Sequence, residues 1–212
     1  MYAEPLIALL TFIASLGFVY GHRLLPTRLE HAAAIVDKFV GPTGMPIRSE
    51  QIRRADCVAI IPGFKTAGKD AHVFGGGFIT CHNGDHWSAP AAVTLQSSNP
   101  NLRVGAEKID LVMLSMNHCD RQKLLSGQFT IGGEISAAWG HRADSDSQIL
   151  FFGRTKSALA EFSLDGITLK PDESSNKALY GRPMSSAEVI DGSFEPPKKA
   201  LAFIKRLTAS FS

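Results

Sequence analysis

The stretch HNGDHWSAP, residues 82–90, packs two histidines, an aspartate and a tryptophan into nine positions. Two imidazoles and a carboxylate are ligands that zinc accepts, and an imidazole can also act as a general base. A metal would need His82 and His86 on one side of a tight turn, joined by a third ligand such as His72 or His118. Strand alternation separates such neighbours, and the Asn-Gly pair supplies the positive φ angles of a hairpin. We therefore predict a hairpin tip here and no metal site.

The other reactive residues form no known catalytic pattern. His118, Cys119 and Asp120 are adjacent, but catalytic partners meet through folding, and neighbours on a helix face different ways. The chain has no nucleophile elbow, phosphate-binding loop, HExxH pair or paired-cysteine knuckle. We expect no catalytic residue, no enzymatic activity and no cofactor. A metal- or thiol-dependent hydrolase built on His82, His86 or Cys119 stays as a third alternative.

The three cysteines, Cys57, Cys81 and Cys119, are widely spaced and odd in number. They predict no disulfide framework, although one bridge could form in an exported protein.

The N-terminal residues 1–21 have the features of a segment that directs a protein to a membrane. The 16 positions from Leu6 to Gly21 carry no charge, which is short for a spanning helix of about 20 residues and long enough for a signal peptide. Basic residues follow this run instead of preceding it, and the positive-inside rule would then keep the next domain in the cytoplasm. A cleaved signal peptide, a retained membrane anchor and a buried apolar helix stay open. The first two predict an exported or membrane-anchored protein, in the periplasm, in the cell envelope or secreted.

Basic residues cluster between Arg48 and Lys69, although the formal net charge is only +2. Arg48, Arg53 and Arg54 belong to a segment that we expect to form a short helix. Lys65 and Lys69, in the stretch GFKTAGK, could form a small anion-binding nest or a plain solvated loop. So small a net charge does not indicate a nucleic-acid partner.

The sequence TRLE at residues 27–30 is a capping box that predicts the start of an amphipathic helix. Gly41-Pro42 would end this helix. Its apolar stripe could pack on the domain core or lie on a lipid surface. The stripe consists of Leu29, Ala32, Ala33, Val36, Phe39 and Val40, and the opposite side carries Arg28, His31, Asp37 and Lys38.

Beyond Cys57, apolar or alternating runs are separated by turn signals, which is typical of antiparallel strands. We expect short helices within residues 117–126 and 173–180, then a linker-like tail and a basic helix at 198–207. The prediction is an α+β fold: a mostly antiparallel, barrel-like sheet of seven to nine strands with N-terminal helices and short peripheral helices. The expected strands are residues 57–61, 72–81, 91–95, 109–116, 129–131, 134–139, 148–152 and 159–164.

Short motifs follow one another along the chain in a definite order. They are DCVAIIP (56–62), a lysine-bearing loop, GDHWSAP (84–90), IDLVMLSMN (109–117), KLLSGQFTIGG (123–133), SLDGITLKPDE (163–173) and NKALYG (176–181). Each motif alone is weak, but the series resembles the SYLF-domain family of lipid-binding proteins over residues 28–182. The sequence differs from the family pattern at three places where that family usually has glycine: Ala71-His72, residues 97–105 and Glu161.

The resemblance implies a non-enzymatic module that associates with anionic, phosphoinositide-like membrane head groups. It also implies a possible protein partner, which is actin in eukaryotic relatives. The alternative is a structural or protein-interaction module of the cell envelope. We divide the chain into a signal peptide or anchor (1–21), a SYLF-like domain (22–182) and a linker with a short helix (183–212). The predicted lipid-binding residues are Arg28, Lys38, Arg48, Arg53, Arg54, Lys65 and Lys69.

Overall fold

A computed structural model gives the structure of the chain. It describes residues 25–40, 47–67, 72–97, 99, 107–116, 121–127, 130–131, 135–144, 146–156, 158–192 and 194–211. The predicted signal peptide or anchor at residues 1–21, Lys69, His118 and Cys119 lie outside the described residues. Within the described residues, no helix is long and apolar enough to cross a membrane.

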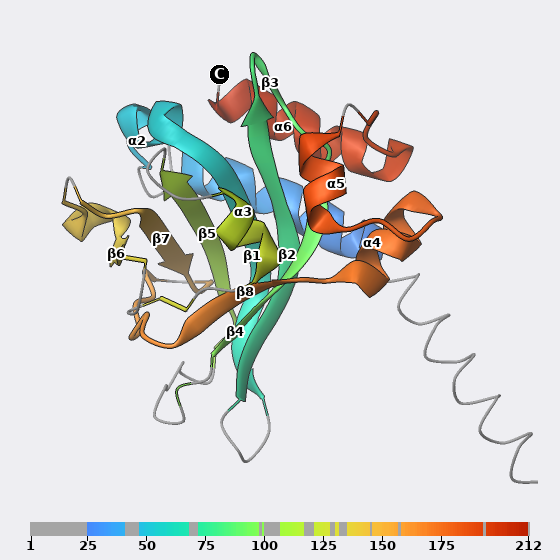
Figure 1. Cartoon of the computed structure of the whole chain (residues 1–212). Coiled ribbons are helices and arrows are strands. Elements are labelled where there is room, and N and C mark those ends of the chain that lie inside the picture. The colour runs from blue at the N-terminus through green and yellow to red at the C-terminus, as the bar shows by residue number, and fades with distance from the viewer. Residues whose placement is uncertain are drawn as a thin grey trace, which may run out of the picture.

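A single curled sheet forms the centre of the molecule (Figure 1). Its strand order is β6-β7-β5-β1-β2-β4-β8, and β3 pairs with β2 off this path. The pairs are antiparallel except β6 with β7, which run parallel. The strands are β1 (Ala55–Ala67), β2 (His72–Asn83), β3 (His86–Trp87), β4 (Ala91–Ser97), β5 (Ile109–Met116), β6 (Ala137–Trp139), β7 (Ile149–Arg154) and β8 (Ile167–Pro171).

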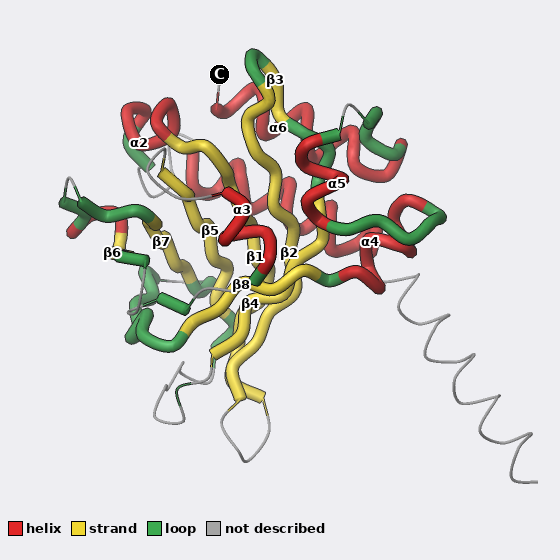
Figure 2. The backbone as a smooth tube through the Cα atoms, viewed as in Figure 1, coloured by secondary structure: helices red, strands yellow, loops and turns green. Residues whose placement is uncertain are grey.

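Helices cover both faces of the sheet (Figure 2). A helix over residues 25–40 lies behind the sheet together with α6, whereas α3 and α5 lie in front of it. Alternate strand residues feed two apolar cores, one on each face. The shorter elements are α2 (Ser49–Arg54), α3 (Arg121–Ser126), η1 (Gly140–Arg142), α4 (Glu173–Tyr180), α5 (Ser186–Asp191), η2 (Lys198–Ala200) and α6 (Leu201–Phe211).

The α+β prediction is confirmed, because helices surround a curled, mostly antiparallel sheet. The glycines at the centre of β2 show why the sheet can curl so closely. A Cβ at Gly77 would lie 2.1 Å from the carbonyl oxygen of Ile60 on the neighbouring strand, and one at Gly75 would lie 2.7 Å from the Ile61 side chain. The backbones of β1 and β2 are therefore closely packed at these glycines.

The helix over residues 25–40 resolves the choice between core packing and a lipid surface. Its apolar stripe is buried in the rear core beside Phe78 of β2 and Phe203 of α6. A stripe that is buried in the protein cannot also insert into lipid, so the lipid-surface alternative is wrong for this face. The predicted start at Thr27 is also wrong, since the chain is already helical at Leu25, which packs into the same core.

Three further segments differ from prediction. Residues 159–164 form no strand beyond an isolated bridge between Leu159 and Arg154, and the strand of this region is β8. Near Ile131, too, only an isolated bridge to Ile135 is described. The segment expected to be linker-like contains α5, whose Val189 and Ile190 are fully buried. The division of the chain into domains stays a prediction.

The HNGDHWSAP stretch is the predicted hairpin. His82 pairs with Trp87 and Asn83 with His86, and Gly84 in the turn has φ 65°. His82 stacks on Trp87 with ring centroids 3.8 Å apart, whereas the register turns His86 to the opposite side of the ribbon. The two imidazoles therefore do not converge on a common point.

One disulfide joins Cys57 of β1 to Cys81 of β2, at positions that pair directly across the two strands. Both cysteines are fully buried in the front core. The bridge therefore fastens the two central strands of the sheet to each other.

Candidate functional site

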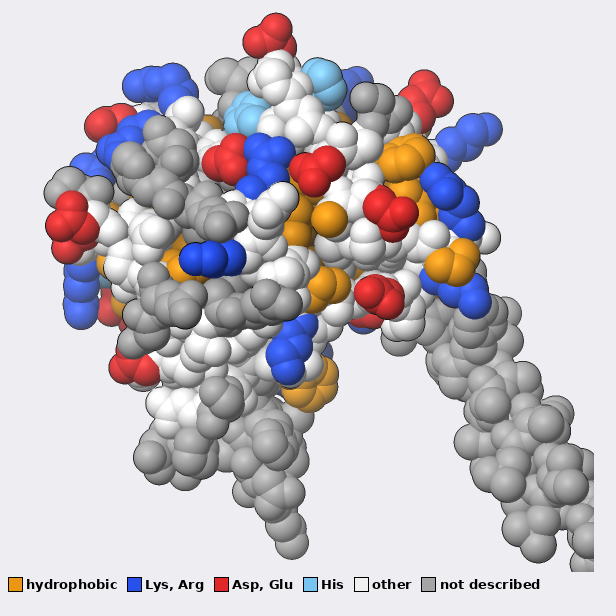
Figure 3. Space-filling view, viewed as in Figure 1, with side chains coloured by type: hydrophobic (Ala, Val, Ile, Leu, Met, Phe, Trp, Pro, Cys, Tyr) orange, Lys and Arg blue, Asp and Glu red, His pale blue; other side chains and the backbone are white. Residues whose placement is uncertain are grey.

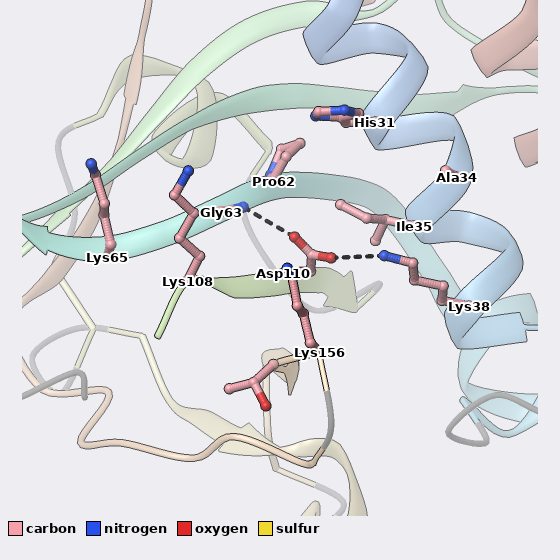
Figure 4. A pocket seen from close by; sticks show the side chains of 11 residues that line it. His31, Ala34, Ile35, Lys38, Pro62, Gly63, Lys65, Lys108, Asp110 and Lys156 are labelled. Atoms are coloured by element: carbon pink, nitrogen blue, oxygen red, sulfur yellow. Dashed lines mark hydrogen bonds and ion pairs between the residues drawn. The ribbon is translucent and has the colours of Figure 1, made fainter. Parts of the chain in front are cut away.

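A pocket of about 380 Å³ lies where the helix over residues 25–40 crosses one end of the sheet (Figure 4). Four separate segments line it: this helix, β1, the chain entering β5, and the chain leaving β7. We call it the basic pocket. Its charged and imidazole side chains are His31, Lys38, Lys65, Lys108, Lys156 and Asp110.

Strand register explains why three of the lysines share one face. Phe64 of β1 pairs with Ile109 of β5, so Lys65 and Lys108 are the next neighbours in that ladder. Asp110 pairs with Arg154, and the same register brings Lys156 beside Lys108. We call Lys65, Lys108 and Lys156 the lysine row.

A bulge in β1 forms part of the pocket wall. The register of β1 shifts against both neighbouring strands between Ile60 and Lys65. Gly63 occupies the bulge with φ 65°, a left-handed conformation that favours glycine. Its backbone N–H donates a hydrogen bond of 3.1 Å to Oδ1 of Asp110. The Pro62-Gly63 dipeptide thus lies at the bulge and lines the pocket.

Asp110 is the single carboxylate among the described residues that line the basic pocket. Its Oδ2 accepts a hydrogen bond of 3.2 Å from the Lys38 ammonium, as the dashed line in Figure 4 shows. In the part of the chain that the structure describes, no carboxylate lies within ion-pair distance of the lysine row. The pocket therefore keeps an excess of positive charge, which suits an anion such as a phosphate group.

A family model described as "Ysc84: Las17-binding protein actin regulator" matches residues 100–210, slightly more than half of the chain. The chain belongs to this family. The match confirms the resemblance to the SYLF-domain family, and since that family consists of binding domains, the chain is a binding module. No curated protein and no solved structure matches it.

The Ysc84 match covers only part of the basic pocket. Lys108, Asp110 and Lys156 lie within the matched residues, whereas His31 and Lys65 come from earlier in the chain. The match also runs beyond residue 182 through α5 and α6.

Two of the seven predicted lipid-binding residues, Lys38 and Lys65, meet in the basic pocket. Arg28 lies elsewhere on the same face, because its guanidinium covers Gly76 of β2, where an added Cβ would lie 2.8 Å from Nη1. The positive charge of Arg28 also acts on Asp172, at the start of α4.

The three arginines near α2 are far from the pocket along the chain fold. Arg48 precedes α2, and Arg53 and Arg54 end it, with all three exposed. Because α2 leads directly into the first residue of β1, these arginines lie at the opposite end of β1 from Lys65. The lipid-binding roles of all seven residues stay predictions.

Sequence reasoning missed Lys108, Lys156 and Asp110. Each flanks or belongs to an apolar strand, where a single charge resembles an ordinary strand end. The signal that could have found them is register, since residues 65, 108 and 156 align only once β1, β5 and β7 are paired.

A second polar cluster lies on the opposite, front face of the sheet. Arg121 of α3 binds Asp56 through two nitrogens, at 2.6 and 3.2 Å, and donates to the His82 carbonyl at 2.8 Å. The hydrogen bond to Asp56 is the largest cause that raises the pKa of Arg121. Asp191 of α5 lies 3.7 Å from the same guanidinium. With its charge balanced in this way, Arg121 joins α3 and α5 to the sheet and leaves no net positive site.

Figure 3 shows that acidic and basic side chains alternate on this front face. The described residues contain no group of three or more His, Cys, Asp or Glu side chains that could hold a metal ion. Among the sites that the structure describes, the basic pocket is therefore the one whose charge most clearly specifies a class of ligand.

Proposed function

We propose that this chain is a non-enzymatic module that binds anionic, phosphoinositide-like membrane head groups through the basic pocket. The main observation in support of this proposal is that lysines from four separate segments meet in this pocket around one carboxylate. Each lysine near an anionic bilayer contributes about 1 kcal/mol. The lysine row would then contribute about 3 kcal/mol, or roughly a hundredfold in affinity.

We propose that the protein is exported or membrane-anchored. The uncharged run before residue 22 supports this location. The Cys57–Cys81 bridge supports it independently, because disulfides persist mainly in oxidising compartments.

Flotation of the full-length chain with liposomes tests the proposal. Vesicles of phosphatidylcholine containing a phosphatidylinositol bisphosphate should carry more protein upward than phosphatidylcholine alone. The variant Lys65→Glu/Lys108→Glu/Lys156→Glu should lose this difference. Its matched control, Lys198→Glu/Lys199→Glu/Lys205→Glu, changes the net charge equally on exposed positions of the C-terminal segment and should retain it. Equal flotation with both vesicle types, for folded wild-type protein, would refute lipid recognition.

A protein partner is the second candidate function, and the description of the family model favours it. The same lysine row could bind an acidic surface such as that of an actin filament. Co-sedimentation with filaments, without lipid, separates the two functions. Pelleting of the wild type but not of the triple glutamate variant, together with equal flotation on both vesicle types, would favour the protein partner.

A further inference from the structure

An exposed phenylalanine lies beside the lysine row. Phe74 of β2 is 45% exposed and pairs directly with Lys65 of β1. Side chains opposite each other in an antiparallel pair lie on the same face, with Cβ atoms about 5 Å apart. The lysine row, which runs from the chain leaving β7 through the chain entering β5 to β1, therefore continues into an aromatic ring on β2.

The β1–β2 hairpin extends past its neighbouring strands, and Phe74 lies at the last pair that β2 forms with β4. Pairing of β1 with β2 continues to Ala67 and His72, whereas pairing of β1 with β5 stops at Phe64. On the other side, pairing of β2 with β4 stops at Phe74 itself, opposite Gln96. Figure 1 shows the two strands projecting beyond the body of the sheet. The ring is thus presented at the edge of the domain.

In the described part of the chain three other large apolar side chains are exposed, but their surroundings differ. Phe194 lies under the guanidinium of Arg182, with 5.2 Å between the ring centroid and the guanidinium carbon. Leu201 begins α6, and Leu159 lies beyond β7. Of the four, Phe74 alone is paired in register with a lysine of the basic pocket.

We propose that Phe74 inserts into the bilayer while the lysine row stays at the level of the head groups. This assignment rests on the proposed function and adds the orientation of the domain, with the β1–β2 hairpin toward the membrane. An anionic bilayer is the partner that presents negative charge and hydrocarbon at adjacent depths. Lysine also suits this position, since its apolar stem can lie beside the ring while the ammonium reaches the phosphates.

The test compares a membrane with a free head group, using the full-length chain. Phe74→Ser should lower the affinity for vesicles containing phosphatidylinositol bisphosphate about tenfold, the effect of withdrawing one phenylalanine from hydrocarbon. Its affinity for soluble inositol trisphosphate should change less than about twofold, because the pocket is intact. Lys65→Glu should weaken both interactions. The control Leu201→Ser removes a similarly exposed side chain, 50% exposed in the wild type, and should change neither.

A fluorescent variant reports insertion directly. The two native tryptophans are buried, at 5% and 8% exposure, so Phe74→Trp adds a reporter on the hairpin. Its emission should shift to shorter wavelength on anionic vesicles and be quenched by lipids brominated in their acyl chains. Soluble inositol trisphosphate should produce neither change.

The outcomes separate this inference from the proposed function. Unchanged vesicle affinity of Phe74→Ser, or no quenching of Phe74→Trp on vesicles that bind it, overturns the insertion of Phe74 and leaves head-group binding standing. Equal losses for vesicles and inositol trisphosphate would show that the ring serves the pocket instead of the bilayer. Wild-type protein that binds neither ligand would overturn the proposed function as well.

Discussion

Asp110 holds Gly63 in place: its carboxylate accepts the backbone N–H of the β1 bulge at 3.1 Å. The other oxygen of the same carboxylate binds the Lys38 ammonium. One acidic side chain therefore both fixes the shape of the basic pocket and neutralises part of its charge. The two roles can be separated by substitution, because an amide oxygen can still accept the hydrogen bond from Gly63.

We expect Asp110→Asn to strengthen anion binding. The amide keeps an acceptor for Gly63 but removes one negative charge from the pocket, which should raise the affinity for anionic vesicles about fivefold. The free energy of unfolding should change by less than about 1 kcal/mol, the usual value of an exposed ion pair. Vesicle titration and urea denaturation measure the two effects. Asp110→Leu is the contrasting variant, because it also loses the acceptor and should be less stable than Asp110→Asn.

The centre of β2 should not tolerate a side chain. In Gly77→Ala the new methyl group would lie 2.1 Å from the Ile60 carbonyl oxygen, so two strands must separate, and we expect a loss of about 3 kcal/mol in unfolding free energy. Gly84→Ala is the matched control, since its turn has φ 65° but nothing within 4 Å of the added atom. That control should lose only about 1 kcal/mol. Similar denaturation midpoints for the two variants would contradict the close packing of β1 and β2.

Several elements of the fold were predictable from local signals. The short helix expected at residues 173–180 is α4, and Asp172 caps it by accepting the Ser175 N–H at 3.0 Å. The helix α5 was missed although it has a local signal: Ser185 and Glu188 form a reciprocal capping box. The prolines at 183, 196 and 197 around it are typical of a linker, and this is why the linker prediction was wrong at α5.

The basic pocket could not be predicted in the same way. Lys65 and Lys108 are neighbours only because β1 pairs with β5 in one particular register, and a shift by one residue would turn one of them to the other face. The bulge at Gly63 changes that register once more. Composition and spacing therefore located basic residues, but only the paired sheet shows which of them meet.

Stability should fall as the pH drops through the titration of His82. Burial is the largest influence on this imidazole and lowers its pKa below 6.5; Asp56 opposes the shift and Arg121 adds to it. The unfolded chain then takes up the proton first, so unfolding becomes easier as the pH falls from 6.5 toward the folded-state pKa. His82→Phe keeps a ring on Trp87 and should flatten this decline. Denaturation at about pH 8 and about pH 5 measures it, with His86→Gln, on the other side of the ribbon from His82, as the control variant.

The Cys57–Cys81 bridge should contribute strongly to stability. The two cysteines are 24 residues apart, and closing a loop of that length removes enough unfolded-state entropy to stabilise the fold by about 3 kcal/mol. The double variant Cys57→Ala/Cys81→Ala should have a free energy of unfolding lower by this amount, even without reductant. Wild-type protein treated with reductant should show the same decrease. Peptide mass spectrometry without reduction should recover the two cysteines in one linked fragment. An unchanged denaturation midpoint in reductant would contradict this prediction. The hydrogen bonds and buried side chains of β1 and β2 would then hold the two strands together without the disulfide.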